Sequence, residues 1–115
     1  LSWPSHGWDW QQPSSDPTQA DWRLVELLTS SELAAEGAVQ GHCVGSYSER
    51  CARGDSAIFQ VRRGEEDRRA TIEVHPPSKR LIQVRGRFNS HPEPEVAAAV
   101  HQWVSAFGLI WNGTF

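Results

Sequence analysis

The sequence lacks the features that mark the common classes of membrane protein and enzyme. It has no apolar run long enough to span a bilayer and no signal-peptide pattern at its start, which predicts that it has no membrane partner. It also lacks a glycine-rich phosphate loop, a G-x-S-x-G elbow and an H-E-x-x-H motif. These absences exclude the best-marked nucleotide-binding proteins, serine hydrolases and zinc proteases.

Cysteine is scarce, with only Cys43 and Cys51 among 115 residues. There is no C-x-x-C or H-x-x-x-H pair, and His42 and His75 are scattered relative to the cysteines, so we expect no metal and no cofactor. On one predicted helix the two cysteines lie about 12 Å apart, at about 1.5 Å per residue, which is too far for a disulfide. Free thiols without a leader indicate the cytoplasm.

Basic residues are almost all arginine, because Lys79 is the only lysine. The formal net charge of −3 argues against a sequence-blind nucleic-acid-binding protein. Arginines nevertheless cluster on the predicted strands, where they could form a local basic patch: Arg62, Arg63, Arg68, Arg69, Arg85 and Arg87.

The length fits one domain. Residues 1–20 show no helical or strand period and are rich in Trp, Pro, Ser and Gln. We expect an irregular arm whose tryptophans, Trp3, Trp8 and Trp10, pack onto the single domain formed by residues 21–115.

Three helices are predicted before the strands. The first begins at Asp21, and its apolar residues recur at spacings of three: Trp22, Val25 and Leu28. The second begins with a capping box over residues 29–32 and ends at Gly37. After a turn over residues 39–43, the third runs from about residue 44 to 52.

Residues 57–63, 69–75 and 80–87 then predict three antiparallel strands joined by short turns. The last helix runs from Pro94 to Gly108 and has an apolar stripe: Val96, Val100, Trp103 and Phe107. The predicted fold is α+β, a three-stranded antiparallel meander with N-terminal helices and a C-terminal amphipathic helix packed on the sheet. We expect the helices to pack on one side of the sheet.

Alternation along the strands predicts two different sheet faces. The apolar set expected to face the last helix is Ile72, Val74, Ile82 and Val84. The opposite set is polar: Thr71, Glu73, His75, Gln83 and Arg85. Such a face is either hydrated, or a buried hydrogen-bond network, or a functional site.

The strongest chemical signal is the segment 41–47, in which His42, Cys43 and Tyr47 lie between and beside glycines. A cysteine at a helix start has a lowered thiol pKa and a raised reactivity. If the helix predicted from about residue 44 to 52 covers the polar face, Cys43 can act as a nucleophile with His42 or His75 as base. Gln83 or Asn89 would then stabilise an oxyanion.

Four pieces of the chain, in this order, resemble the PcfJ-like protein family of bacterial plasmids, phages and other mobile elements. The pieces are Glu36-Gly37, the segment 42–47, the segment 70–73 and the segment 83–89. The resemblance implies a link to conjugative plasmid transfer, longer family members and no settled activity. The residues that it marks are His42, Cys43, Tyr47, Thr71, Glu73, Gln83, Gly86 and Asn89.

Three functional hypotheses follow. The first is an intracellular module of a mobile element with a His/Cys-centred polar pocket, whose partner is nucleic acid or a protein of that system. The second is a cysteine-dependent hydrolase or transferase, and the third is a structural or interaction domain of a longer protein. The candidate catalytic residues are His42, Cys43, Tyr47, Glu73, His75, Gln83 and Asn89, and the candidate binding residues are Thr71, Arg85 and Gly86.

Overall fold

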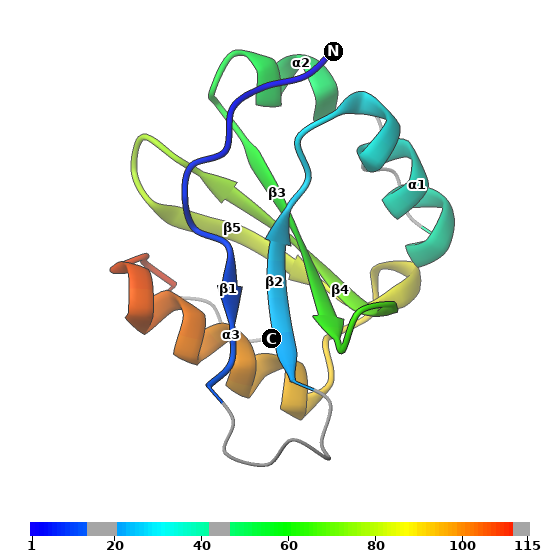
Figure 1. Ribbon diagram of the computed structural model, residues 1–115, viewed down its shortest axis with the longest axis vertical. Helices are drawn as coiled ribbons and strands as arrows, with labels where there is room; N and C mark the ends of the chain where they lie inside the picture. Colours follow the sequence, from blue (N-terminus) through cyan, green and yellow to red (C-terminus); the bar gives the residue numbers. More distant parts are fainter. Residues whose placement is uncertain (14–20, 42–46, 112–115) are drawn as a thin grey trace.

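The computed structural model describes residues 1–13, 21–41 and 47–111, which form a five-stranded antiparallel sheet with helices on both sides (Figure 1). The strands are β1 (Trp10–Gln11), β2 (Trp22–Glu26), β3 (Ala57–Arg63), β4 (Asp67–His75) and β5 (Arg80–Arg85). The helices are α1 (Ser30–Gln40), α2 (Ser48–Ala52), the 3-10 turn η2 (Arg87–Asn89) and α3 (Pro94–Phe107). Each strand pairs with its neighbour in sequence. The α+β class is confirmed, but the sheet has five strands and not three.

The segment predicted as the first helix is strand β2. Its buried residues alternate, because Trp22, Leu24 and Glu26 point to one side while Arg23 and Val25 are only partly buried. A period of two is the pattern of a strand, and β2 is fixed by pairing along its full length with β3. The helix was predicted from apolar residues three apart, but Trp22 and Val25 lie on opposite faces of the strand. The predicted helix is therefore wrong.

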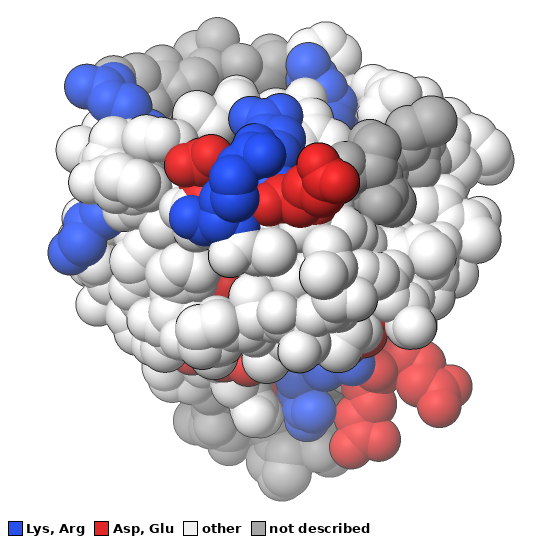
Figure 2. All heavy atoms as spheres, turned by 90° about the horizontal axis from the view of Figure 1, so that it is seen from above, with Lys and Arg blue, Asp and Glu red and all other residues white. Residues whose placement is uncertain are grey.

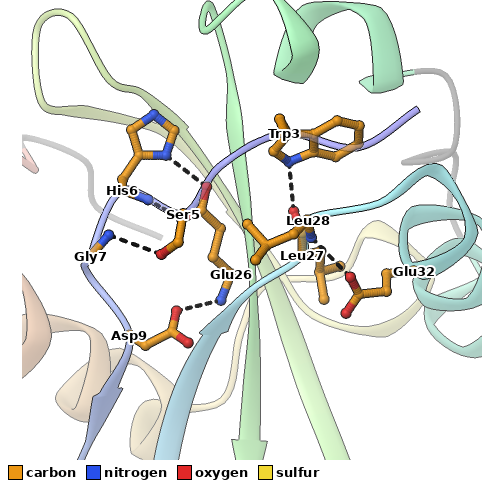
Figure 3. A network of polar contacts seen from close by, with 9 residues as sticks. All are labelled: Trp3, Ser5, His6, Gly7, Asp9, Glu26, Leu27, Leu28 and Glu32. Atoms are coloured by element: carbon orange, nitrogen blue, oxygen red, sulfur yellow. Dashed lines mark hydrogen bonds and ion pairs between the residues drawn. The ribbon is translucent and has the colours of Figure 1, made fainter.

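The N-terminal residues lie along β2 and are held by polar contacts to it (Figure 3). The buried Trp3 indole donates to the Leu27 carbonyl at 2.9 Å. The carboxylate of Glu26, also buried, accepts from the His6 backbone at 2.8 Å and contacts His6 Nδ1 at 2.7 Å. Asp9 accepts from the Glu26 backbone at 2.8 Å. These contacts align Trp10–Gln11 as strand β1.

Helix α1 begins where the capping box predicted. The Thr29 hydroxyl accepts from the Glu32 backbone at 3.1 Å, and the Glu32 carboxylate accepts from the Leu28 backbone at 3.1 Å. The helix does not end at Gly37 as predicted but continues to Gln40. The next residue, Gly41, caps it with a φ of 72°, the left-handed conformation of a helix end. The predicted turn over residues 39–43 therefore begins too early. The proposed start of the next helix, at residue 44, lies outside the described residues.

The larger core lies between the sheet and α3. Trp103 is fully buried, its indole donates to the Trp8 carbonyl at 2.7 Å, and its ring lies 4.9 Å from that of Phe59. Ile72, Val74 and Val84 face this core as predicted.

Ile82 does not face this core, because the register of β4 and β5 shifts between Glu73 and Val74. This irregularity turns Ile82 outward, to 55% exposure, and places Leu81 in the core instead.

A second, smaller core lies at the other side of the sheet, beneath α1 and α2. It is formed by Trp3, Leu27, Leu33, Cys51 and Ile58. Figure 1 shows α1 and α3 on opposite sides of the strands, so the prediction that all helices pack on one side is wrong. None of the helices in the described ranges has the length and apolar character needed to cross a membrane.

We expect the Trp103→Ala variant to lose about 3–5 kcal/mol of unfolding free energy, since it removes a fully buried aromatic side chain. Denaturant unfolding measures the loss. Ser105→Ala, an exposed change on the same helix, is the matched control and should stay within about 0.5 kcal/mol of the parent. Equal unfolding midpoints for the two variants would contradict the packing of α3.

Candidate functional site

One face of the sheet is lined by polar side chains from all four of the longer strands. We call it the polar face, and it is the side that α1 and α2 cover in part. The cross-strand register places these side chains in rows: Arg23, Arg62 and Arg68, then Gln60, Thr71 and Arg85, then Glu73 and Gln83. Glu73 and Gln83, which were predicted to lie on one polar face, are directly opposite each other on β4 and β5.

Helix α1 is tied to the polar face by a buried carboxylate. Glu36 has no exposed surface, and its two oxygens accept from Gln60 Nε2 at 2.8 Å and from Thr71 Oγ1 at 2.7 Å. Both contacts are short, as expected for hydrogen bonds to a charged acceptor. A buried carboxylate without donors would be strongly unfavourable. The contact therefore fixes α1 over one position of the sheet.

A second buried carboxylate lies one row further along the polar face. Glu73 is 4% exposed, and its Oε2 accepts from Ser56 Oγ at 3.0 Å and pairs with Arg50 Nη2 at 3.3 Å. Gln83 Nε2 lies 3.5 Å from Oε1, which is a long contact. Because Arg50 belongs to α2 and Ser56 precedes β3, Glu73 holds the second helix to the sheet.

The two carboxylates therefore anchor both ends of the segment that carries the predicted His/Cys pair. Glu36 fixes the helix that ends at Gly41, and Glu73 fixes the helix that follows Tyr47. His42 and Cys43 themselves lie outside the described residues. Their predicted catalytic roles remain predictions, and so does the thiol–imidazole contact.

The two described neighbours of that segment are structural in character. Tyr47 is partly buried, packs on the smaller core and lies beneath the Arg50 guanidinium at 4.9 Å from ring centroid to Cζ. Cys51 is buried in the same core. Burial, reinforced by the charges of Glu26 and Glu73 against an opposing effect of Arg50, raises the pKa of Cys51 from 9.0 to about 11. Its thiol is thus protonated and unreactive at neutral pH.

The structure does not bring every predicted site residue to this network. His75 Nδ1 lies 2.8 Å from Ser78 Oγ in the β4–β5 turn, and Arg85 faces Thr71 across the strands. Gly86 is buried, and its N–H donates to the Ser90 carbonyl at 2.9 Å. Asn89 is exposed in η2. Of the predicted residues that the structure describes, Thr71, Glu73 and Gln83 join the two carboxylate clusters.

The η2 turn has an unusual backbone. Phe88 and Asn89 both have positive φ, of 57° and 59°. Asparagine tolerates this conformation, but a residue such as phenylalanine incurs about 1–2 kcal/mol in it. Beside the turn lies a polar pocket of about 270 Å³, lined by Asp67, Arg69, Gly86, Arg87, Ser90, His91 and Glu93. The predicted third strand ends earlier, at Arg85, because the chain turns here.

Three arginines form a row across the polar face. Arg23 lies opposite Arg62, and Arg62 lies opposite Arg68, on three adjacent strands. The Nε atoms of Arg23 and Arg62 are buried without a hydrogen-bond partner. None of the three guanidinium groups pairs with a carboxylate of the described residues. Like charges directly opposite one another destabilise a sheet.

Other arginines of the same strands are neutralised. Arg63 pairs with Glu95 at 3.1 Å, on the α3 side of the sheet. Arg69 bonds to Asp67 at 2.8 Å and to Glu93 at 2.9 Å, and the Asp67 hydrogen bond raises the pKa of Arg69 further. Arg63 and Arg69 are therefore neutralised by carboxylates, whereas the arginine row of the polar face is not.

Sequence reasoning missed four residues of the network: Glu36 as a site residue, Arg50, Ser56 and Gln60. Glu36 lies three residues after the buried Leu33, so helical spacing places both on one face. Gln60 lies between Phe59 and Val61 and alternates with them. In both cases a polar residue lies within a pattern of buried apolar residues, and this was the available sign of a buried hydrogen-bonding role.

Among the side chains that the structure describes, no group of three His, Cys, Asp or Glu residues lies close enough to hold a metal ion. His6 contacts the buried Glu26 carboxylate. His101 lies against the Trp111 ring, with centroids 4.5 Å apart.

Comparison with protein-family models identifies the family of this chain. The family model described as PcfJ-like protein matches residues 18–101, which confirms the resemblance carried by the sequence motifs. Comparisons with the curated proteins and with the solved structures gave no match. The matched region extends from just before β2 into α3, and it includes both carboxylate clusters and the arginine row.

Thr71→Val should lower the unfolding free energy by about 1–3 kcal/mol, because the buried Glu36 carboxylate loses a donor while side-chain volume is kept. Gln83→Leu is the matched comparison on the next strand. It should cost less than about 1 kcal/mol, since its contact to Glu73 is long and Glu73 keeps Ser56 and Arg50. Denaturant unfolding measures both losses of free energy. A larger loss for Gln83→Leu than for Thr71→Val would contradict the proposed hydrogen-bond network.

Proposed function

This chain belongs to the PcfJ-like protein family, and we propose that it is an intracellular module of a bacterial mobile element that binds nucleic acid on its polar face. The observation that carries the proposal is the row of Arg23, Arg62 and Arg68, which has no carboxylate partner among the described residues. Guanidinium groups bind phosphate oxygens through paired donors. A phosphate backbone would supply the missing acceptors.

The energetic cost of the row supports a ligand. Adjacent arginines repel one another across the strands, and two buried Nε–H groups lack acceptors. A purely structural sheet would be more stable with carboxylates or apolar residues at these positions. Arginine in this pattern is typical of a site that an anion completes.

The net charge of −3 does not oppose a local site. Figure 2 views the molecule from the α2 end and shows basic side chains directly beside acidic ones. On that part of the chain Arg50 pairs with Glu73 and Arg53 with Asp55. Acidic residues thus neutralise Arg50 and Arg53, while the row on the polar face retains its charge.

A second candidate function is a cysteine-dependent hydrolase or transferase, with Cys43 as nucleophile and His42 or His75 as base. It is favoured by the two buried carboxylates, which anchor the helices on either side of the segment. A rigid support of this kind is what a positioned nucleophile needs. Substrate would then lie near Tyr47, Glu73 and Gln83.

Iodoacetamide labelling tests this second candidate. At pH 7–8 we expect alkylation of Cys43 and not of Cys51 in the folded protein, because the pKa of Cys51 is raised to about 11 and its side chain is buried. Peptide mass mapping locates the label, and the denatured chain, in which both thiols react, is the control. Preferential labelling of Cys51 would remove the reason for a nucleophile at Cys43.

The arginine row is tested by fluorescence anisotropy with a labelled single-stranded oligonucleotide over a range of salt concentrations. Each lost phosphate contact should reduce the slope of log binding constant against log salt by about 0.7. The Arg62→Gln/Arg68→Gln double variant should therefore lose about 1.4 of slope and bind more weakly. Its folding stability should not fall, because a like-charge contact is removed.

Arg53→Gln is the matched control, because Arg53 is not part of the arginine row. Its Nε lies 3.1 Å from Asp55 Oδ2, so its charge is already paired. The affinity and salt slope of this variant should equal those of the parent. An unchanged slope in the double variant, or no binding by the parent chain at all, would contradict the proposed function.

A further inference from the structure

We propose that Phe88 is a stacking platform for one unpaired base, so that the polar face selects single-stranded over double-stranded nucleic acid. This inference rests on the proposed function and adds a specificity residue to it. Phe88 is 76% exposed and is the most exposed large hydrophobic side chain of the described residues. Its ring stacks on no aromatic or guanidinium group among them.

Phe88 also has an unusual backbone conformation. Its φ of 57° and ψ of 37° place it in the left-handed region, which bulky residues rarely adopt. An asparagine or glycine would meet this backbone requirement with less strain, and a polar side chain would suit the solvent better. The chain instead holds an aromatic ring outward in a strained turn, which is a frequent feature of binding sites.

Neighbouring glycines allow the ring to take this position. A Cβ atom at Gly41, the C-cap of α1, would lie 2.4 Å from Phe88 Cδ1 and 2.5 Å from Cε1. A Cβ at Gly86 would lie 2.8 Å from Ser90 Oγ and 3.2 Å from the His91 carbonyl oxygen, so the turn is closely packed at this position. One edge of the ring therefore rests against the end of α1, and much of its surface remains free.

Arginines lie close to Phe88 along the chain. Phe88 comes three residues after Arg85, the last residue of β5, and Arg85 pairs with Thr71 of β4, the strand that carries Arg68. Arg87, which is exposed and has no ion pair in the described part of the chain, precedes the ring. Arginines that follow a backbone next to an aromatic ring form the usual arrangement for single-stranded nucleic acid.

Stacking gives the selectivity. A base in the middle of a duplex has both faces covered by its neighbours, whereas a base of a flexible single strand can turn one face to a side chain. The arginine row contacts phosphates of either form. Phe88 should therefore strengthen binding of single strands and leave the binding of duplexes unchanged.

The test compares a labelled oligothymidylate with a duplex of equal length by fluorescence anisotropy at one salt concentration. Phe88→Ala should weaken single-strand binding by about 5- to 150-fold and change duplex binding less than about twofold. Phe88→Tyr, which keeps an aromatic face, should retain the parent affinity, whereas Phe88→Leu should resemble Phe88→Ala. Val39→Ala changes another exposed apolar residue, in α1, and should have no effect.

Phe88→Asn guards against a folding defect, because asparagine accepts the left-handed backbone. It should fold as the parent does and bind as Phe88→Ala does. If all Phe88 variants bind single strands like the parent while the Arg62/Arg68 variant is weakened, the stacking proposal is wrong and the proposed function stands. If Phe88→Leu retains full affinity, the ring is an apolar contact and not a stacking platform. Absence of all binding by the parent would overturn both proposals.

Discussion

The buried Glu36 carboxylate is the contact on which the arrangement of the polar face depends. A carboxylate with no exposed surface is tolerated only where donors reach it, and Gln60 and Thr71 supply them from two adjacent strands. This requirement fixes the position of α1, since a shift of α1 along the sheet would leave the charge without acceptable partners. The position of α1 in turn sets the place of Gly41, and Gly41 admits the Phe88 ring. One ionic hydrogen-bond cluster thus links the helix, the strands and the η2 turn.

The polar face is divided into two regions of opposite character. Beneath the helices, Glu36 and Glu73 are negative and are satisfied by neutral donors and by Arg50. Towards the β3–β4 hairpin, the row of Arg23, Arg62 and Arg68 is positive and lacks acidic partners among the described residues. The first region gives rigidity, and the second leaves donors available. Thr71 and Glu73 were predicted as site residues because they lie on the polar face. Their direct contacts are with Glu36 and with Ser56 and Arg50, which hold the helices to the sheet.

The parts of the fold that depend on local signals could be predicted from the sequence, and those that depend on long-range pairing could not. The α3 stripe, the cap at Thr29 and the strands β3 to β5 follow from spacing, capping and turn residues. Strand β2 was mistaken for a helix because its extended conformation depends on pairing with β3, which lies about 33–41 residues later in the sequence. Ile82 was assigned to the wrong face because a bulge has no marker in sequence. The polar set on β4 and β5 was recognised, but Glu36 and Gln60 required knowledge of which helix lies over which strand.

An acidic protein can present a basic site when its charges are segregated by the sheet. Side chains of successive residues point to opposite faces, so Arg62 and Arg63 belong to different environments although they are adjacent in sequence. The α3 side supplies Glu93 and Glu95, which neutralise Arg63 and Arg69, whereas the polar face has its carboxylates buried under the helices. At moderate salt, the electrostatic field at a bound ligand comes mainly from charges within about 10 Å, and not from the net charge of the whole chain. Net charge alone is therefore a poor guide to the partner of this domain, and the pairing state of each arginine is the better one.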